Sequence, residues 1–219
     1  MHSTSFEAAR TIMVDSQVRP NKVTDRRIID AMRRLPRERF VPAGASALAY
    51  ADEDVPLGGG RVLLEPMVIA RLVQLAAVHA GEKVLVVAAG TGYGAALLAA
   101  SGVAVTALEE DKALTAVART ALAGIGGIAL VEGALTAGWA AGGPYDVVFV
   151  EGAIEELPAA LVAQVKPQGG RLVAIQSLDG RTSQAVSGMV MGGKVALLPA
   201  FDCATPLLPA FRRAAAFVF

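Results

Sequence analysis

The stretch VLVVAAGTGYG, residues 84–94, decides the fold class of this 219-residue chain. Its four branched apolar residues predict a buried strand, its glycines predict a tight turn, and the Ala- and Leu-rich residues that follow predict a helix. Gly90 and Gly92 lack a Cβ, so the backbone of this turn can closely approach a bound ligand. In open parallel sheets, ligands bind beyond the carboxyl ends of the strands, at turns of this kind. The stretch therefore predicts a buried strand–turn–helix unit and a candidate ligand site.

Strands and helices are expected to alternate around this unit, which favours an α/β fold with a parallel sheet and right-handed crossovers. The predicted strands are Lys83–Val87, Ala104–Leu108, Ala129–Glu132, Asp146–Val150 and Arg171–Ile175. The predicted helices between them are Gly92–Ala100, Lys112–Leu122 and Glu155–Gln164. The tail reads as two further strands, Lys194–Leu198 and Ala215–Phe219, without a helix between them, so an antiparallel pair is expected at one edge. The complete sheet is then mixed, with about seven strands.

The N-terminal part is expected to be a helical cap. Residues 6–18 form one helical pattern that Pro20 ends, and Thr24 and Asp25 can cap a second helix. A flexible glycine run, Pro56–Gly60, precedes a helix that starts at Pro66. We expect a single domain over 1–219, with a cap at 1–60 and a Rossmann-like core at 61–219.

Composition excludes several classes of protein and of metal site. A hydrophobic fraction of 54% with 18% charged residues excludes disorder, and the lone Cys203 with two histidines excludes Cys-rich and multi-histidine metal sites. The uncharged run 84–108 is long enough for a membrane span, but its glycines divide it into short elements. Residues 1–40 carry nine basic and five acidic residues, a pattern typical of a solvated helix face. We therefore expect a cytoplasmic protein with no metal, membrane or nucleic-acid partner; oligomeric state is left open.

Acidic residues end the two strands after the glycine turn. Glu109 stands about twenty residues beyond the turn, where a carboxylate can accept hydrogen bonds from ribose hydroxyls. Glu110 follows it, and Glu132-Gly133 ends the third strand, where an adenine amino group could be met. Glycines and acids at three successive strand ends predict an adenosine site. A nicotinamide dinucleotide stays open, because residues 90–95 satisfy the loose G-x-G-x-x-G/A pattern, although no second mononucleotide-binding half follows.

Motifs along most of the chain resemble the protein-L-isoaspartate O-methyltransferase family, a branch of the S-adenosylmethionine-dependent methyltransferases. They are Met13-Val14 with Gln17, Thr24-Asp25, Ala31-Met32, Pro36-Arg37-Glu38, Phe40-Val41-Pro42, Tyr50-Ala-Asp52, Pro56-Leu-Gly58, Pro66, Gly90-Thr-Gly92-Tyr93, Pro144-Tyr-Asp146 and Gly169-Gly-Arg-Leu-Val173. The resemblance implies a Rossmann-like methyltransferase fold, S-adenosylmethionine as cofactor, and damaged aspartyl and asparaginyl sites of proteins or peptides as substrates. The cofactor-binding residues that it implies are Leu63, Ala89, Gly90, Thr91, Gly92, Glu109, Glu110, Glu132 and Gly133.

The chain departs from the family pattern at the acceptor side. The family sequence G-Q-T-I-S-x-P becomes residues 60–66, GRVLLEP, which places Leu64 at the serine position. An acid and a glycine of the family's first motif become Val86 and Ala88. Glu151 could replace that acid as the partner of the cofactor ammonium group, or could be an exposed loop acid.

Loss of the serine does not by itself exclude methyl transfer. A carboxylate acceptor is already ionised at neutral pH, so the reaction needs orientation and no general base. The acceptor-side candidates are Arg61, Leu64 and Glu65, and Arg61 could replace the lost hydrogen bond or be a solvated loop residue. Two alternatives to isoaspartyl methylation remain: a methyltransferase with a small-molecule substrate, and a family member that binds the cofactor without catalysis.

Overall fold

The uncharged run forms three elements of the expected kind in the computed structural model, which describes residues 2–178 and 182–213. Strand β3 (Lys83–Val87) leads through the glycine turn into helix α4 (Tyr93–Ala99), and strand β4 (Ala104–Glu109) follows. Within the described part of the chain, no helix has both the length and the apolar character needed to cross a bilayer.

These strands belong to a mixed sheet with the order β10-β8-β7-β6-β3-β4-β5, and β9 pairs with β8 outside this path. The remaining strands are β5 (Ile128–Glu132), β6 (Val147–Ile154), β7 (Gln168–Ser177), β8 (Ser183–Met191), β9 (Lys194–Val195) and β10 (Leu198–Cys203). Strands β3 to β7 pair in parallel, whereas β8, β9 and β10 add in antiparallel fashion. The expected mixed, Rossmann-like sheet is confirmed.

The order of the strands places a ligand crevice at β3. From β3 the chain first builds outward to β4 and β5 and then returns to β6 on the other side of β3. Open α/β sheets bind ligands at such a switch point. The register pairs Val87 with Leu108, and Glu109 with Glu132, so the predicted acids lie at the carboxyl edge beside the glycine turn.

Two hydrophobic clusters cover the two faces of the sheet, because alternate residues of a strand point to opposite sides. Val84 and Val86 belong to one cluster, and Leu85 and Val87 belong to the other. The larger cluster includes residues of helices α3 (Pro66–Leu75), α4 and α5 (Lys112–Ala121), and the smaller one includes Leu161 of α6 (Ala159–Val162). Strand residues buried on both faces explain the run of branched apolar residues.

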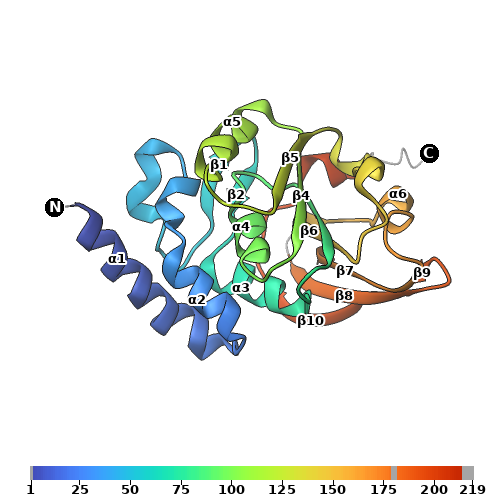
Figure 1. Cartoon of the computed structure of the whole chain (residues 1–219), viewed down its shortest axis with the longest axis horizontal. Coiled ribbons are helices and arrows are strands. Elements are labelled where there is room, and N and C mark those ends of the chain that lie inside the picture. Colours follow the sequence, from blue (N-terminus) through green and yellow to red (C-terminus); the bar gives the residue numbers. More distant parts are fainter. Residues whose placement is uncertain (1, 179–181, 214–219) are drawn as a thin grey trace.

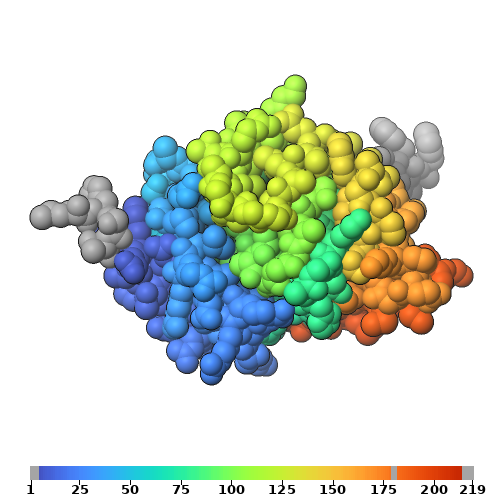
Figure 2. Space-filling model, viewed as in Figure 1, coloured from blue at the N-terminus to red at the C-terminus, as the bar shows by residue number. Residues whose placement is uncertain are grey.

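The N-terminal helices lie together at one side of the molecule (Figures 1 and 2), and their buried residues belong to the larger cluster. Helix α1 (His2–Met13) continues as a π-helical turn (Val14–Val18), and α2 (Arg26–Arg34) starts where the Asp25 side chain accepts a hydrogen bond from the Arg27 amide. Met13, Ile28 and Met32 are fully or almost fully buried members of this cluster.

The glycine run, for which no strand was predicted, belongs to a hairpin of β1 (Val55–Gly58) and β2 (Arg61–Leu63). Two predictions about elements are wrong. The predicted helix Glu155–Gln164 shrinks to α6, which starts only after Pro158. In the tail, the predicted strand Lys194–Leu198 is divided between the two-residue β9 and the first residue of β10, and the strands β8 and β10 were not predicted. The predicted strand Ala215–Phe219 lies outside the described residues.

Ala88 adopts a left-handed conformation, with φ of 61°, at the end of β3. A Cβ in this conformation costs about 1–2 kcal/mol, which offsets the usual cost of introducing glycine. We expect the free energy of unfolding of Ala88→Gly, measured with urea, to equal or exceed that of the wild type, with any loss below about 0.5 kcal/mol. The matched control Ala116→Gly, on the exposed side of α5, should lose about 1 kcal/mol. Equal losses for both variants would contradict strain at residue 88.

Candidate functional site

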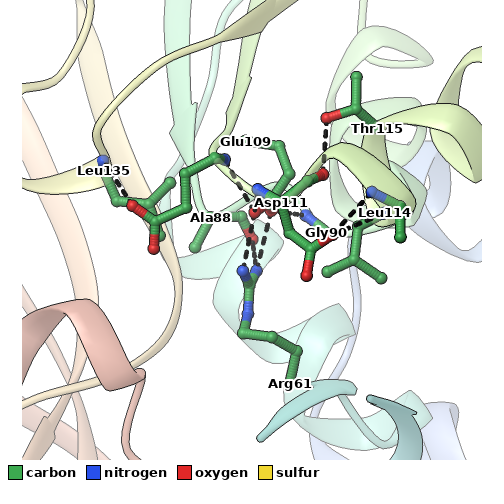
Figure 3. Close-up of polar contacts among 10 residues, drawn as sticks. Arg61, Ala88, Gly90, Glu109, Asp111, Leu114, Thr115 and Leu135 are labelled. Atoms are coloured by element: carbon green, nitrogen blue, oxygen red, sulfur yellow. Dashed lines mark hydrogen bonds and ion pairs between the residues drawn. The ribbon is translucent and has the colours of Figure 1, made fainter. Parts of the chain in front are cut away.

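The carboxylate of Glu109 is the centre of the polar contacts at the carboxyl edge of the sheet (Figure 3). Its side chain is 0% exposed. Three backbone amides donate to it: Gly90 to Oε2 at 2.7 Å, and Glu110 and Asp111 to Oε1 at 2.9 and 3.0 Å. The glycine turn and the loop after β4 therefore hold this carboxylate through three backbone donors.

Arg61 reaches the same carboxylate from strand β2. Its Nη1 donates to Oε1 of Glu109 at 2.9 Å, and its Nη2 donates to Oε2 at 3.0 Å and to the carbonyl oxygen of Ala88 at 2.9 Å. The Arg61 side chain is only 7% exposed. The interpretation of Arg61 as a solvated loop residue is therefore wrong, and the guanidinium lies on the predicted ribose acceptor.

The backbone of the glycine turn is fixed by its neighbours. Gly90 and Gly92 have φ of 58° and 95°, which favours glycine. A Cβ on Gly92 would lie 2.9 Å from Cδ1 of Leu122. The Thr91 hydroxyl donates to the carbonyl oxygen of Phe40 at 2.6 Å, and the Ala89 amide donates to that of Leu108 at 3.0 Å. These contacts tie the turn to the cap and to strand β4.

The residues predicted to lie beside the adenine, Glu110, Glu132 and Gly133, differ in how they are held. Glu110 accepts a hydrogen bond at 3.5 Å from the amide of Leu135, beyond β5. The Glu132 carboxylate turns toward α5, where Oε1 lies 3.3 Å from Nη2 of Arg119 in a half-exposed ion pair. Gly133 stays at the strand end, because its amide donates to the carbonyl oxygen of Glu109 at 3.1 Å. The backbone of residues 132–133, more than the Glu132 side chain, is positioned beside the site.

The acceptor-side residues differ in their surroundings. Leu64 is 1% exposed and belongs to the larger hydrophobic cluster, as does its neighbour Leu63, which was predicted to bind the cofactor. Glu65 is half-buried before α3, and its amide donates to Oδ1 of Asp54 at 2.7 Å. Partial burial, with the nearby charges of Asp54 and Asp52, raises the pKa of the Glu65 carboxyl. At the position of the family serine, this chain has a packing residue.

Sequence reasoning assigned no role to Arg37, which is fully buried beneath this region. Its Nε donates to the carbonyl oxygen of Ala49 at 2.7 Å, and its Nη2 donates to that of Leu64 at 2.6 Å. The guanidinium lies 4.7 Å from the ring centroid of Tyr93, and its burial lowers the pKa of Arg37. Arg37 therefore connects the cap to the β1–β2 hairpin and to α4. The only signal in the sequence was its place in the Pro36-Arg37-Glu38 motif.

Glu151, near the end of β6, is a second buried carboxyl in this region. It is not an exposed loop acid, because only 7% of it is exposed. Its Oε2 has no hydrogen-bond partner among the residues that the structure describes. A Cβ on Gly94 would collide with this carboxyl, so the glycine at the start of α4 leaves the room that Glu151 needs. Burial raises the pKa of Glu151 to about 8, although Arg61 and Arg37 oppose the shift.

This raised pKa predicts how stability depends on pH. The folded state keeps the Glu151 proton up to about pH 8, whereas the unfolded chain loses it near its ordinary pKa of 4.5. Stability should therefore fall as pH rises from about 5 to 8, by up to about 1.4 kcal/mol per pH unit. Glu151→Gln cannot titrate, so its stability relative to the wild type should rise over this window in urea unfolding. The exposed control Glu53→Gln should keep a constant difference; a constant difference for Glu151→Gln as well would contradict the raised pKa.

The polar groups and the open backbone of this site fit a nucleoside that carries an amino-acid tail. Glu109 offers a fixed carboxylate for ribose hydroxyls, the glycine turn offers backbone without Cβ, and Glu151 has an unpartnered buried oxygen that suits an ammonium group. No group of three or more His, Cys, Asp or Glu side chains within residues 2–178 and 182–213 is placed to hold a metal ion. The fold and site define a doubly wound α/β domain with a candidate ligand crevice at the switch point of its sheet.

Solved structures share this fold. One, a protein-L-isoaspartate O-methyltransferase, aligns with a TM-score of 0.78 over 91% of this chain and 65% of that chain, at 22% identity. Another, from Plasmodium falciparum, is described as a putative protein-L-isoaspartate O-methyltransferase in complex with S-adenosyl-L-homocysteine. It aligns with a TM-score of 0.77 over 92% of this chain and 98% of that chain, at 17% identity.

Sequence comparison identifies the family. The model of the protein-L-isoaspartate(D-aspartate) O-methyltransferase family matches residues 9–190. A protein-L-isoaspartate O-methyltransferase of Methylorubrum extorquens is 39% identical over 80% of this chain and 77% of its own length. One of Methylorubrum populi is 41% identical over 76% and 79%. The chain belongs to the protein-L-isoaspartate O-methyltransferase family.

Proposed function

We propose that this protein is an S-adenosylmethionine-dependent methyltransferase that methylates the carboxylate of isoaspartyl residues in proteins or peptides. The observation that carries the proposal is the position of Glu109, fixed by three backbone amides at the end of β4 and beside the glycine turn. A carboxylate in this position binds the ribose of a nucleoside cofactor. Membership of the family supports the choice of cofactor and substrate.

Different residues of this crevice would contact different parts of the cofactor. Glu109 would accept the ribose hydroxyls, the turn from Ala89 to Gly92 would pack against the nucleoside, and the backbone of residues 132–133 would meet the adenine. Glu151 would accept a hydrogen bond from the ammonium group of the cofactor. It would thereby take the place of the family's strand acid, whose position is occupied by Val86 in this chain. When bound, S-adenosylmethionine supplies an electrophilic methyl group on a sulfonium.

The chain's remaining contribution is to orient the acceptor. An isoaspartyl carboxylate is ionised at neutral pH and attacks without a general base, so its correct placement supplies the acceleration. The β1–β2 hairpin, whose Leu57 and Arg61 lie beside Gly90, and Glu65, which follows this hairpin, are the proposed acceptor side. The whole chain, with cap and core joined by one hydrophobic cluster, would act as a single domain.

The buried Leu64 favours a second candidate function, in which the acceptor differs from an isoaspartyl residue. The side chain offers no hydrogen bond at the family serine position. A small-molecule acceptor, or binding of the cofactor without catalysis, would then replace protein methylation.

A labelled-methyl transfer assay separates these candidates. We expect transfer to an isoaspartyl peptide and none to the matched peptide with a normal aspartyl linkage. Glu109→Ala should lower this transfer on the order of 100-fold, because the ribose loses hydrogen bonds to a charged acceptor. Transfer only to metabolites of a cell extract would support a changed substrate. Binding of S-adenosylhomocysteine without transfer to peptide or extract would contradict a methyltransferase.

A further inference from the structure

The hydrogen bonds on Glu109 leave no acceptor position for a ligand. A carboxylate has about four lone-pair sites, and the Glu109 oxygens already accept five hydrogen bonds. Two come from Arg61 and three come from backbone amides. Ribose hydroxyls can therefore bond to Glu109 only if some of these donors leave.

Only the two bonds from Arg61 can be given up without moving the sheet. The amides of Glu110 and Asp111 directly follow the carboxylate in sequence, and the Gly90 amide belongs to the turn that neighbouring residues hold. The Arg61 guanidinium stands at the end of a flexible side chain. Glu109 also does not depend on Arg61, because the three amides still stabilise its charge after the guanidinium leaves.

The segment that carries Arg61 is built to move more easily than the sheet. Its hairpin is a separate two-stranded sheet outside the main one. Gly58 ends the first strand of this hairpin and Gly59-Gly60 form its turn; all three residues are exposed and have positive φ. Glycine gives a turn of this kind wide conformational freedom. A displacement of Arg61 therefore requires no change in β3 or β4.

We propose that Arg61 is an internal competitor of the cofactor: its guanidinium occupies the ribose-binding oxygens of Glu109, and the cofactor binds only when Arg61 leaves them. This inference rests on the proposed function. It gives Arg61 a role in setting cofactor affinity, which differs from the acceptor-side role suggested by its place in the sequence.

The direction of the effect of a substitution tests this proposal. A residue that merely supports the site weakens binding when it is removed, whereas removal of a competitor strengthens it. We expect Arg61→Gln to bind S-adenosylhomocysteine on the order of tenfold more tightly than the wild type in calorimetric titration, which corresponds to about 1.4 kcal/mol. Arg61→Lys keeps the charge but loses the two-pronged contact, so its affinity should be intermediate.

A matched control comes from Arg171, which pairs with Glu82 near the amino ends of the parallel strands. Arg171→Gln should leave the affinity unchanged within about twofold. Weaker or equal binding by Arg61→Gln would overturn the proposal while leaving the proposed function intact. Failure of the wild type and both Arg61 variants to bind S-adenosylhomocysteine would instead overturn the proposed function. If Arg61→Gln does not fold, Arg61→Lys decides in the same way: tighter binding supports competition, and equal or weaker binding overturns it.

Discussion

Replacing Glu109 by alanine is expected to lower the free energy of unfolding by about 3–5 kcal/mol, because it leaves the Arg61 guanidinium buried without its carboxylate partner. Both side chains of this pair are almost completely buried, so water cannot replace the lost contact. Urea unfolding of the wild type and of Glu109→Ala at the same pH measures the loss. The three amides that donate to Glu109 add to it when their acceptor disappears.

The double variant Glu109→Ala with Arg61→Met separates the two causes. Removing the guanidinium as well should restore about 2 kcal/mol or more, because a buried apolar side chain needs no partner. The unsatisfied amides should account for the loss that remains. A double variant no more stable than Glu109→Ala would show that Arg61 finds other partners when the carboxylate is removed, and would contradict the expected cost of an unpaired buried guanidinium.

Restoring the family serine at position 64 is expected to destabilise this protein strongly. Leu64 is buried in the larger hydrophobic cluster, so Leu64→Ser creates a cavity and buries a hydroxyl. Together these effects should cost about 3–5 kcal/mol in urea unfolding. The half-buried Leu57, on the same hairpin, provides the control, since Leu57→Ser should cost about 1 kcal/mol. A Leu64→Ser variant as stable as the wild type would mean that residue 64 faces an open acceptor pocket.

The parallel core was predictable because its signals are local. Branched apolar runs mark strands that are buried on both faces, and a glycine turn and acids at strand ends mark the ligand edge. Once strands are parallel, their carboxyl ends must meet at one edge, so Glu109 and Glu132 were expected to be neighbours and are paired in register.

The antiparallel edge was harder to predict. Strand β8 reads SQAVSGMVM, in which serines and a glycine interrupt the apolar alternation that predicts strands. Its pairing with β7 supplies what the local sequence lacks. For helix α6 the local pattern predicted too much structure. An apolar pattern suggested ten helical residues, but β6 ends at Ile154 and the helix is a single turn that starts after Pro158.

The sequence could not predict that the Arg61 guanidinium occupies the carboxylate of Glu109. The contact between Arg61 and Glu109 spans 48 positions and depends on how the β1–β2 hairpin lies over the sheet. No periodicity encodes such a contact. Glu151 and Gly94 pose the same problem, since the missing Cβ of one makes room for the carboxyl of the other across two elements.

Calorimetric titration of the wild-type protein with S-adenosylhomocysteine, and separately with a nicotinamide dinucleotide, tests most directly whether this crevice holds the methyl donor's nucleoside. We predict saturable binding of one S-adenosylhomocysteine per chain, weakened on the order of 100-fold in Glu109→Ala, and no binding of the dinucleotide. Binding of the dinucleotide without binding of S-adenosylhomocysteine would contradict the assignment of the cofactor.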